Sequence, residues 1–505
     1  MAHILSFDFG TGGVRAGLYD TDRQKMLAQA DAAYATHYPR AGWAEQQPRE
    51  WLAALRAAGR AVLAETGRRS VDAVCVATTA STVAVCDKDG APLRDALLWM
   101  DCRADAEARQ TAEFSHSVMR FCGGSDAVEW LVPKSMWLKR NQPDIWASAD
   151  IVCEALDYIN FHLTGEWTGS LMNAACKWNY DSDARRFVPE IYEAFGIPEL
   201  ADKLPQRIVP VGGVIGPMRA EMASELGLDN RPIIAQGGID AHIGILGADT
   251  VEPGGMLFIG GTSIVQLVQL AEEADVTAFW GPYPNALTPG RWLVECGQVA
   301  AGSMLNWLAF DMFGLDPAGH KALIAEVAAH PGRSDGLLAL DYMMGNRTPF
   351  RDASLRGAMM GLTLGHGRAD IYSSAVDSLA LGSANVLSVL KARGVGVDRI
   401  MMAGGIVKNA AWLQATVDAL GMPVQVARED NLSLIGATAA AASAIGVYSD
   451  LPTAAKSCVA PSTELLPDPR RADWYAGMLP LYLEATEATR PVLHKLAGRQ
   501  MRSGQ

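Results

Sequence analysis

Cysteine is scarce in this 505-residue sequence, and its eight cysteines are scattered. No two of them have the CxxC spacing of zinc or redox sites, so we expect reduced, mostly buried thiols. Long hydrophobic runs are also missing, because Asp8 interrupts the first apolar stretch, glycine pairs break residues 253–271, and residues 431–449 are mostly Ala, Gly and Ser. We therefore expect no signal peptide, no membrane span and a cytoplasmic location.

Basic residues are in the minority, since 43 Lys and Arg stand against 56 Asp and Glu and leave a formal charge of −13. No global field favours nucleic acid or anionic lipid, so any phosphate must be bound by local donors. The chain is 49% hydrophobic and 20% charged, the balance of a packed globular protein, and its length predicts two to three domains. No Pro-rich or Gly/Ser-rich linker divides it, so we expect two halves that pack directly around a cleft.

Two segments have the pattern of a β-hairpin with a glycine turn. Residues 3–9 and 14–19 flank the turn 10–13, and residues 256–259 and 264–268 flank the turn 260–263. The repetition predicts two similar halves. Apolar strands are expected at 71–76, 83–86, 232–236, 400–403 and 424–426, and helices at 50–65, 104–119, 369–392, 409–420 and 434–446. This alternation is typical of an α/β protein.

The first turn follows a carboxylate, Asp8, at the end of a strand. Its glycines expose backbone N–H groups that suit phosphate oxygens, although an ordinary hairpin turn is the alternative. GxxxxGK[ST] is absent, and GxGxxG would need a glycine where Arg15 stands, so a P-loop enzyme and a dinucleotide fold are disfavoured. A third glycine pair, Gly404-Gly405, precedes a helix, where either a nucleoside approaches the backbone or the chain simply turns.

Asp240 follows an apolar strand and precedes the second hairpin by about 20 residues. That position suits chemistry at the junction of the halves, and the alternative is a helix N-cap. His242 either faces a polar substrate or is an ordinary histidine with its hydrogen bonds satisfied.

The order of these motifs resembles the FGGY family of carbohydrate kinases, which have the actin-like ATPase fold. Further matches lie at residues 42–46, 98–104, 157–158 and 163–165. The most specific match, residues 357–377, fits the C-terminal signature of the family at every position. The other signature, near residues 133–138, departs from the family at Ser135, where an apolar residue is usual.

The resemblance implies two actin-like, ribonuclease H-like α/β domains with a catalytic cleft between them. Residues 1–246 would carry the sugar site, the first phosphate hairpin and the catalytic Asp, and residues 247–490 would bind the nucleotide. Residues 491–505 are assigned as a tail, and the several Arg, Lys and Gln residues of the segment 485–505 predict a frayed surface helix there. Closure of the domains around both substrates would exclude water.

The resemblance also implies that Asp240 is the catalytic base, that Asp8 and Asp240 hold Mg²⁺, and that ATP is the co-substrate. Two close carboxylates remain ionised only beside a cation, which supports the metal. The implied phosphate and nucleotide residues are Thr11, Gly12, Gly13 and Arg15 on one side, Gly261, Thr262 and Ser263 on the other, and Gly302, Gly404, Gly405 and Asn409 at the nucleotide.

Residues 77–83, Ala-Thr-Thr-Ala-Ser-Thr-Val, bear on which substrate is bound. Glycerol kinases of the family usually have Gln-Arg-Glu here and typical xylulokinases Gln-Met-His-Gly, so both pockets are disfavoured. This segment and residues 345–349 look more like the ribulose and other pentulose or pentitol branches, and we expect a ketopentose such as xylulose or ribulose. The alternatives in the family are a pentitol, a tetritol or glycerol. The candidate pocket residues are Thr79, Ser81, Trp99, Asp101, Lys177, Trp178, Asp240 and His242.

A rival from another class is an actin-like ATPase switch without a sugar substrate. It would share the two hairpins but lacks the matches at 99–103 and 357–377. As partners we expect a small sugar or polyol and ATP, with no nucleic acid and no membrane, and a homodimer is left open.

Overall fold

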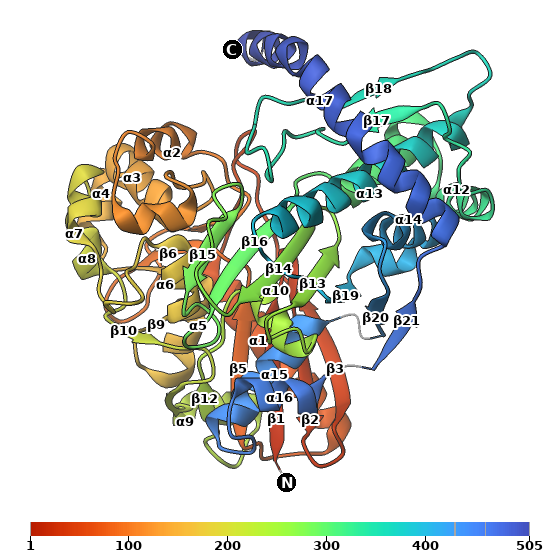
Figure 1. The fold of residues 1–505 in the computed structure, drawn as a ribbon. Coiled ribbons are helices and arrows are strands. Elements are labelled where there is room, and N and C mark those ends of the chain that lie inside the picture. Colours follow the sequence, from red (N-terminus) through yellow and green to blue (C-terminus); the bar gives the residue numbers. More distant parts are fainter. Residues whose placement is uncertain (1, 429–430, 460, 504–505) are drawn as a thin grey trace.

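The computed structural model describes residues 2–428, 431–459 and 461–503. Two large sheets dominate it, one in each half of the chain (Figure 1). The six-stranded sheet has the order β11-β12-β5-β1-β2-β3. Its strands are β1 (His3–Phe9), β2 (Gly13–Asp20), β3 (Lys25–Ala33), β5 (Ala73–Thr78), β11 (Val214–Pro217) and β12 (Ile233–Ala235).

The seven-stranded sheet has the order β15-β16-β14-β13-β19-β20-β21. In each sheet an antiparallel hairpin, β1–β2 or β13–β14, lies beside a parallel strand, β5 or β19. This repeat confirms the prediction of two similar halves. The strands are β13 (Gly255–Gly260), β14 (Ile264–Leu270), β15 (Trp280–Pro284), β16 (Trp292–Gln298), β19 (Arg399–Ala403), β20 (Val424–Ala427) and β21 (Ser462–Leu465).

The central strands β5 and β13 are buried almost throughout, because helices cover both faces of each sheet. Helix α1 (Pro48–Thr66) packs against β2 and β3 on the first sheet. Trp51 of α1 and Phe7 of β1 are buried in one hydrophobic core there. All eight cysteines are free and seven of them are buried, as predicted.

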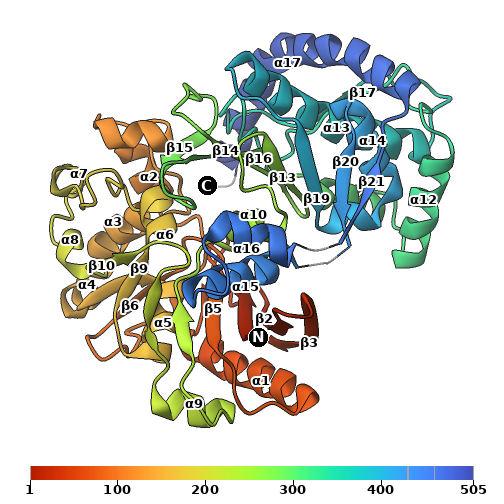
Figure 2. The same ribbon diagram turned by 60° about the horizontal axis from the view of Figure 1, so that its bottom comes forward.

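Helices α10 (Asp240–Gly247) and α15 (Leu432–Ala444) cross each other between the two sheets, with α16 (Leu451–Cys458) beside them (Figure 2). Helix α10, from the first half, contacts β13 and β14, whereas α15, from the second half, contacts β1 and β5. The two helices cross closely where Gly247 and Gly436 have no side chain. An added Cβ would lie 2.1 Å from Leu432 O at Gly247 and 2.0 Å from Ile243 O at Gly436. Each half therefore contributes a helix that packs against the sheet of the other half.

A second layer of the N-terminal half lies beside the first sheet and carries most of its helices (Figure 1). The expected helix over 104–119 is interrupted: α2 ends at Thr111, and a 3₁₀ helix begins at Ser117, capped by His116 Nδ1. The remaining elements of the N-terminal half are β4 (Glu45–Gln46), β6 (Val83–Cys86), β7 (Ala96–Leu97), α2 (Asp105–Thr111), η1 (Ser117–Cys122), α3 (Leu131–Asn141), α4 (Pro143–Ser148), β8 (Ile151–Glu154), α5 (Ala155–Thr164), β9 (Thr168–Ser170), α6 (Leu171–Lys177), α7 (Pro189–Ala194), α8 (Leu200–Lys203), β10 (Arg207–Val209) and α9 (Ala220–Leu226). Of these, α5 and α9 pack on the hydrophobic core of the first sheet.

The C-terminal half is completed by helices on the outer face of its sheet. They and the short strands are α11 (Gly302–Asn306), η2 (Trp307–Met312), α12 (Pro317–Ala329), β17 (Leu338–Leu340), β18 (Ala358–Met360), α13 (Arg368–Ala392), η3 (Gly405–Lys408), α14 (Ala410–Leu420) and α17 (Pro469–Ser503). Among the described residues, α13 alone has the length and hydropathy of a membrane span, but 89% of that window is buried inside the protein, as in a core helix.

The end of the chain differs from the expected frayed tail. Helix α17 runs without interruption past residue 491 to Ser503 and contacts α13 and α14. It is held there because Leu493 and Ala497, beyond the expected boundary, are buried. Residues 504–505 of the expected tail lie outside the described residues.

Candidate active site

Asp8 stands near the end of β1, opposite Arg15 in the β1–β2 register. The turn between the strands is closed by a backbone hydrogen bond from Gly10 N to Gly13 O at 3.0 Å. Gly13 has no room for a side chain, because an added Cβ would lie 2.8 Å from Ala32 O. The first turn is thus a tight hairpin with its backbone exposed next to a carboxylate.

Asp240 is the first residue of α10, and Ile239 occupies the N-cap position. The alternative role as N-cap is therefore wrong, and among the described residues the Asp240 carboxylate accepts a hydrogen bond from its neighbour Ala241 N alone, at 2.7 Å. The strand–helix turn before it needs Gly237, where an added Cβ would lie 1.9 Å from Val76 O. This close passage against β5 brings Asp240 to the cleft.

The carboxyls of Asp8 and Asp240 influence each other. Burial raises the pKa of Asp8 to about 6, opposed by the Asn431 hydrogen bond and the Arg15 charge. Burial also raises the pKa of Asp240 to about 7, with further contributions from the negative charges of Asp8 and Glu295. Oδ1 of Asp8 is buried and has no hydrogen-bond partner among the described residues. Burial therefore favours the neutral form of both carboxyls, and at Asp8 the Arg15 charge offsets it only in part.

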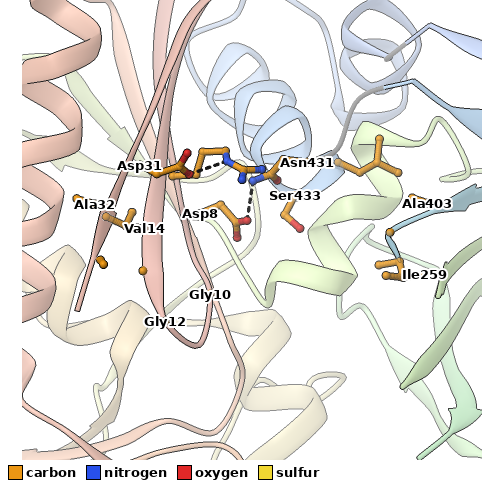
Figure 3. A pocket seen from close by; sticks show the side chains of 15 residues that line it. Asp8, Gly10, Gly12, Val14, Asp31, Ala32, Ile259, Ala403, Asn431 and Ser433 are labelled. Atoms are coloured by element: carbon orange, nitrogen blue, oxygen red, sulfur yellow. Dashed lines mark hydrogen bonds and ion pairs between the residues drawn. The ribbon is translucent and has the colours of Figure 1, made fainter. Parts of the chain in front are cut away.

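A cavity of about 440 Å³ opens between Asp8 and the C-terminal half. Figure 3 shows Asp8 held by Asn431, with Ser433 beside it at the start of α15. Asn431 Oδ1 also accepts from Leu434 N at 2.7 Å, so it caps the helix whose N-terminus lines the cavity. Free backbone N–H groups at such an N-terminus favour anions. The predicted residues Gly12, Gly13, Arg15 and Gly404 line this cavity.

A second cavity, of about 320 Å³, continues on the C-terminal side and is lined by Gly405, next to Gly404 of the first cavity. Gly404 has φ +87°, and at Gly302 an added Cβ would lie 2.5 Å from Gly261 O. Both positions thus require glycine, and a side chain at residue 302 would collide with the backbone of the second turn. Besides Gly405, the predicted residues Gly261, Thr262, Gly302 and Asn409 line it, together with Leu305, Asn306, His320, Ile324, Lys408 and Trp412.

A third cavity, of about 370 Å³, lies on the other side of the first turn and contains Asp240. Gly10 lines both it and the cavity at Asp8, so the three cavities form a row. Across it, Lys177 Nζ and Glu295 Oε2 form a buried ion pair at 3.0 Å, and His242 Nε2 lies 3.4 Å from the same oxygen. Burial acts to raise the pKa of Glu295, but the neighbouring positive charges outweigh it and hold that pKa well below its usual range.

Two indole rings form a wall of this third cavity. Trp130 and Trp280 lie with their centroids 5.9 Å apart, and Lys177 Nζ stands 4.6 Å from the Trp130 centroid. The Arg347 guanidinium lies 4.9 Å from the Trp280 centroid. An aromatic wall with paired charges and hydroxyls is the usual construction of a site for a polyhydroxy compound.

Two family models cover most of the chain. The N-terminal domain of the FGGY family of carbohydrate kinases matches residues 3–247, and the C-terminal domain of that family matches residues 256–445. The chain belongs to the FGGY family of carbohydrate kinases. It is a carbohydrate kinase with the two-domain actin-like fold, as predicted, and FGGY kinases use ATP as co-substrate.

Similar proteins span nearly the full length of this FGGY kinase. A ribulokinase of Mycolicibacterium smegmatis is 27% identical and covers 99% of this chain and 96% of its own. An FGGY carbohydrate kinase domain-containing protein of Danio rerio is 28% identical, with 95% and 96% covered. The solved structure of a xylulose kinase from Rhodospirillum rubrum superposes with a TM-score of 0.87 at 26% identity, covering 97% and 100%.

Most predicted site residues of this FGGY kinase meet in the row of cavities. Thr11 and Ser263, predicted at the phosphates, line the third cavity instead, and Thr11 Oγ1 accepts from Trp99 Nε1 at 3.0 Å. The predicted pocket residues that line the third cavity are Thr79, Ser81, Trp99, Lys177, Asp240 and His242.

Asp101 and Trp178, predicted as pocket residues, do not line the third cavity. Asp101 is fully buried and binds the Arg103 guanidinium through both oxygens, at 2.8 and 2.7 Å. Trp178 is fully buried too and donates from Nε1 to Glu154 at 2.7 Å. Both side chains therefore hydrogen-bond to buried partners beneath the site.

Glu129, Trp130, Trp280, Glu295 and Arg347 line the third cavity and were not among the predicted pocket residues. Glu295 lies within a buried strand, β16, where an acidic residue among apolar neighbours is itself a signal of function. Arg347 lies in residues 345–349, a segment singled out by its sequence, although no pocket residue was predicted in it.

Proposed function

We propose that this kinase phosphorylates a five-carbon ketose such as ribulose or xylulose, and that it works in the cytoplasm. The observation that carries the proposal is the cavity at Asp240, where the Lys177–Glu295 pair faces the hydroxyl-bearing turn of Thr79 and Ser81. A ketose needs both donors and acceptors along its chain, which these groups supply. The ribulokinase and xylulose kinase among the similar proteins support the same substrate class.

Asp240 is the base in this proposal, accepting the proton of the sugar hydroxyl as it attacks the γ-phosphorus. Its pKa of about 7 suits proton transfer near neutral pH. Arg15, the turn glycines and the N-terminus of α15 bind the phosphates from the neighbouring cavity. Gly10 borders both cavities, so the hydroxyl and the γ-phosphate meet beside the first turn.

Asp8 and Asp240 fit a magnesium ion. Oδ1 of Asp8 lacks a partner, and both carboxyls have raised pKa values that a cation would lower. Among the described residues no group of three or more His, Cys, Asp or Glu is suited to a metal, and Mg²⁺ typically uses only one or two carboxylates beside phosphate oxygens. When bound, the ion neutralises phosphate charge.

The proposal is tested by coupled ADP release with ATP and Mg²⁺ against D- and L-ribulose, D- and L-xylulose, ribitol, xylitol, erythritol and glycerol, each with a no-sugar blank. Strong turnover with one pentulose is expected. Turnover with a polyol or glycerol alone would overturn the ketose assignment. Equal rates in all wells, including the blank, would argue against sugar phosphorylation altogether.

A further inference from the structure

Lys134 is a fully buried cation in α3, outside the row of cavities. Its Nζ donates to two backbone carbonyls, Ser81 O and Leu98 O, both at 2.7 Å. These carbonyls belong to the two turns that line the sugar-side cavity, since Ser81 itself and Trp99, next to Leu98, are lining residues. One ammonium group therefore joins two separate walls of the site.

Ser81 has a backbone conformation that needs support. Its φ is +59°, in the left-handed region that a serine rarely adopts. Both of its backbone groups are held by buried charged side chains: the carbonyl by Lys134, and the N–H by Glu154 Oε2 at 2.6 Å. Such a conformation persists where the surroundings determine it, and it clusters at ligand sites.

The hydroxyl of Ser81 is the group that this conformation places. The residue is 2% exposed and lines the cavity, yet Oγ has no hydrogen-bond partner among the described residues. A buried hydroxyl without a partner is costly unless a ligand satisfies it. Its neighbour Thr79, in contrast, already pairs with Thr82 at 3.1 Å.

Glu154 is anchored in turn by side chains beneath the site. Oε1 accepts from Trp178 Nε1 at 2.7 Å, and Oε2 accepts from Asn173 Nδ2 at 2.9 Å in addition to Ser81 N. This network gives Trp178 a role in supporting the cavity from which it is absent. It also fixes the carboxylate oxygen that receives the Ser81 amide.

We propose that Lys134 and Glu154 are positioning residues that hold Ser81 in its left-handed conformation, so that Oγ binds a hydroxyl of the sugar. The inference rests on the proposed function for the identity of the ligand. The hydrogen bonds of Lys134 and Glu154 to the backbone of Ser81 do not depend on which sugar binds.

The test compares Lys134→Met with Lys139→Met, on the same helix, whose lysine pairs at the surface with Glu199 at 2.6 Å. With D-ribulose and D-xylulose as probes, Lys134→Met is expected to raise the sugar KM by about tenfold or more, with the KM for ATP unchanged. Lys139→Met is expected to leave both at wild-type values. Equal behaviour of the two variants would overturn the proposal.

A double-mutant cycle separates positioning from general damage. If Lys134 acts through Ser81, Lys134→Met has little further effect on the sugar KM once Ser81→Ala is present. Independent, multiplying effects would overturn the proposal. Where Lys134→Met does not fold, Glu154→Leu takes its place in the same cycle, because a hydrocarbon side chain cannot accept the hydrogen bond from Ser81 N.

A crystal structure of the folded variant decides the question even if neither pentulose is phosphorylated. Ser81 is expected to leave the left-handed region in Lys134→Met or Glu154→Leu and to keep it in Lys139→Met. An unchanged φ at Ser81 would overturn the positioning role, whereas a lack of turnover by the wild type would count only against the proposed function.

Discussion

The side-chain amide of Asn431 donates to the carboxylate of Asp8 at 2.8 Å, across 423 positions of sequence. The same residue caps α15 through its Oδ1. One side chain thus ties the first strand of the protein to the helix N-terminus at the phosphate cavity.

Replacing Asn431 tests this tie. Asn431→Ala removes both the cap and the bond to Asp8, so we expect about 1 kcal/mol lower stability and a higher KM for ATP. Asn431→Ser keeps a capping oxygen but not the amide donor. It should therefore retain stability and still show the raised KM in a titration with ATP and Mg²⁺. A wild-type KM in Asn431→Ser would refute a role for the bond.

Asp240→Asn is expected to lower sugar phosphorylation by about 100-fold or more while nucleotide binding persists. The same change should stabilise the fold at pH 8. The folded pKa of about 7 lies above the 3.8 of an ordinary Asp side chain, so the native state loses stability as pH rises between these values, and Asn removes that penalty. We expect a melting temperature about 2–4 °C higher at pH 8 and no difference near pH 4. A lower melting temperature at pH 8 would contradict the assignment.

The acidic limb of the pH profile should depend on magnesium. At low Mg²⁺, kcat/KM should fall as pH drops through about 7, because Asp240 must be ionised to accept a proton. Raising Mg²⁺ favours both carboxylates and should move the midpoint to lower pH. The measurement is kcat/KM from pH 5.5 to 8.5 at low and high Mg²⁺. A midpoint that stays fixed argues against a shared metal site.

Lys177→Met should raise the KM for the sugar by about tenfold or more and leave the KM for ATP unchanged. The reason is that Glu295 loses its ion-pair partner inside the cavity. Arg120→Met is the matched control, because Arg120 also bridges the two halves, to Glu273 at 3.0 Å, but at the surface. If both variants change the sugar KM alike, the effect comes from joining the halves and not from the pocket.

Gly302→Ala should weaken nucleotide binding, because the new methyl would lie 2.5 Å from Gly261 O in the second cavity. Gly396→Ala, where nothing lies within 4 Å of the added carbon, controls for the change in backbone entropy. Calorimetric titration with ADP should show at least about tenfold weaker binding for Gly302→Ala only. Equal affinities in the two variants would show that the close contact relaxes freely.

The parts of the site that were predictable have local signals in the sequence. Asp8 and Asp240 each stand where an apolar strand meets glycines, and such a turn places its neighbours regardless of distant residues. Glu295 has a local signal, because it is an acidic residue in an apolar strand, but its partner Lys177 is 118 positions away and no local pattern identifies the pair. Asp101 was misplaced although Arg103, two residues on, already offered it a partner.

The crossing of α10 and α15 has a consequence for biosynthesis. Ser6 Oγ and Thr438 Oγ1 meet at 2.8 Å in the interior, although 432 residues separate them. The face of β1 that packs against α15 is thus covered only after α15, more than 400 residues later in the chain, has been synthesised. We therefore expect one face of the first sheet to stay exposed during most of the synthesis of the chain, as the kind of apolar surface that chaperones shield.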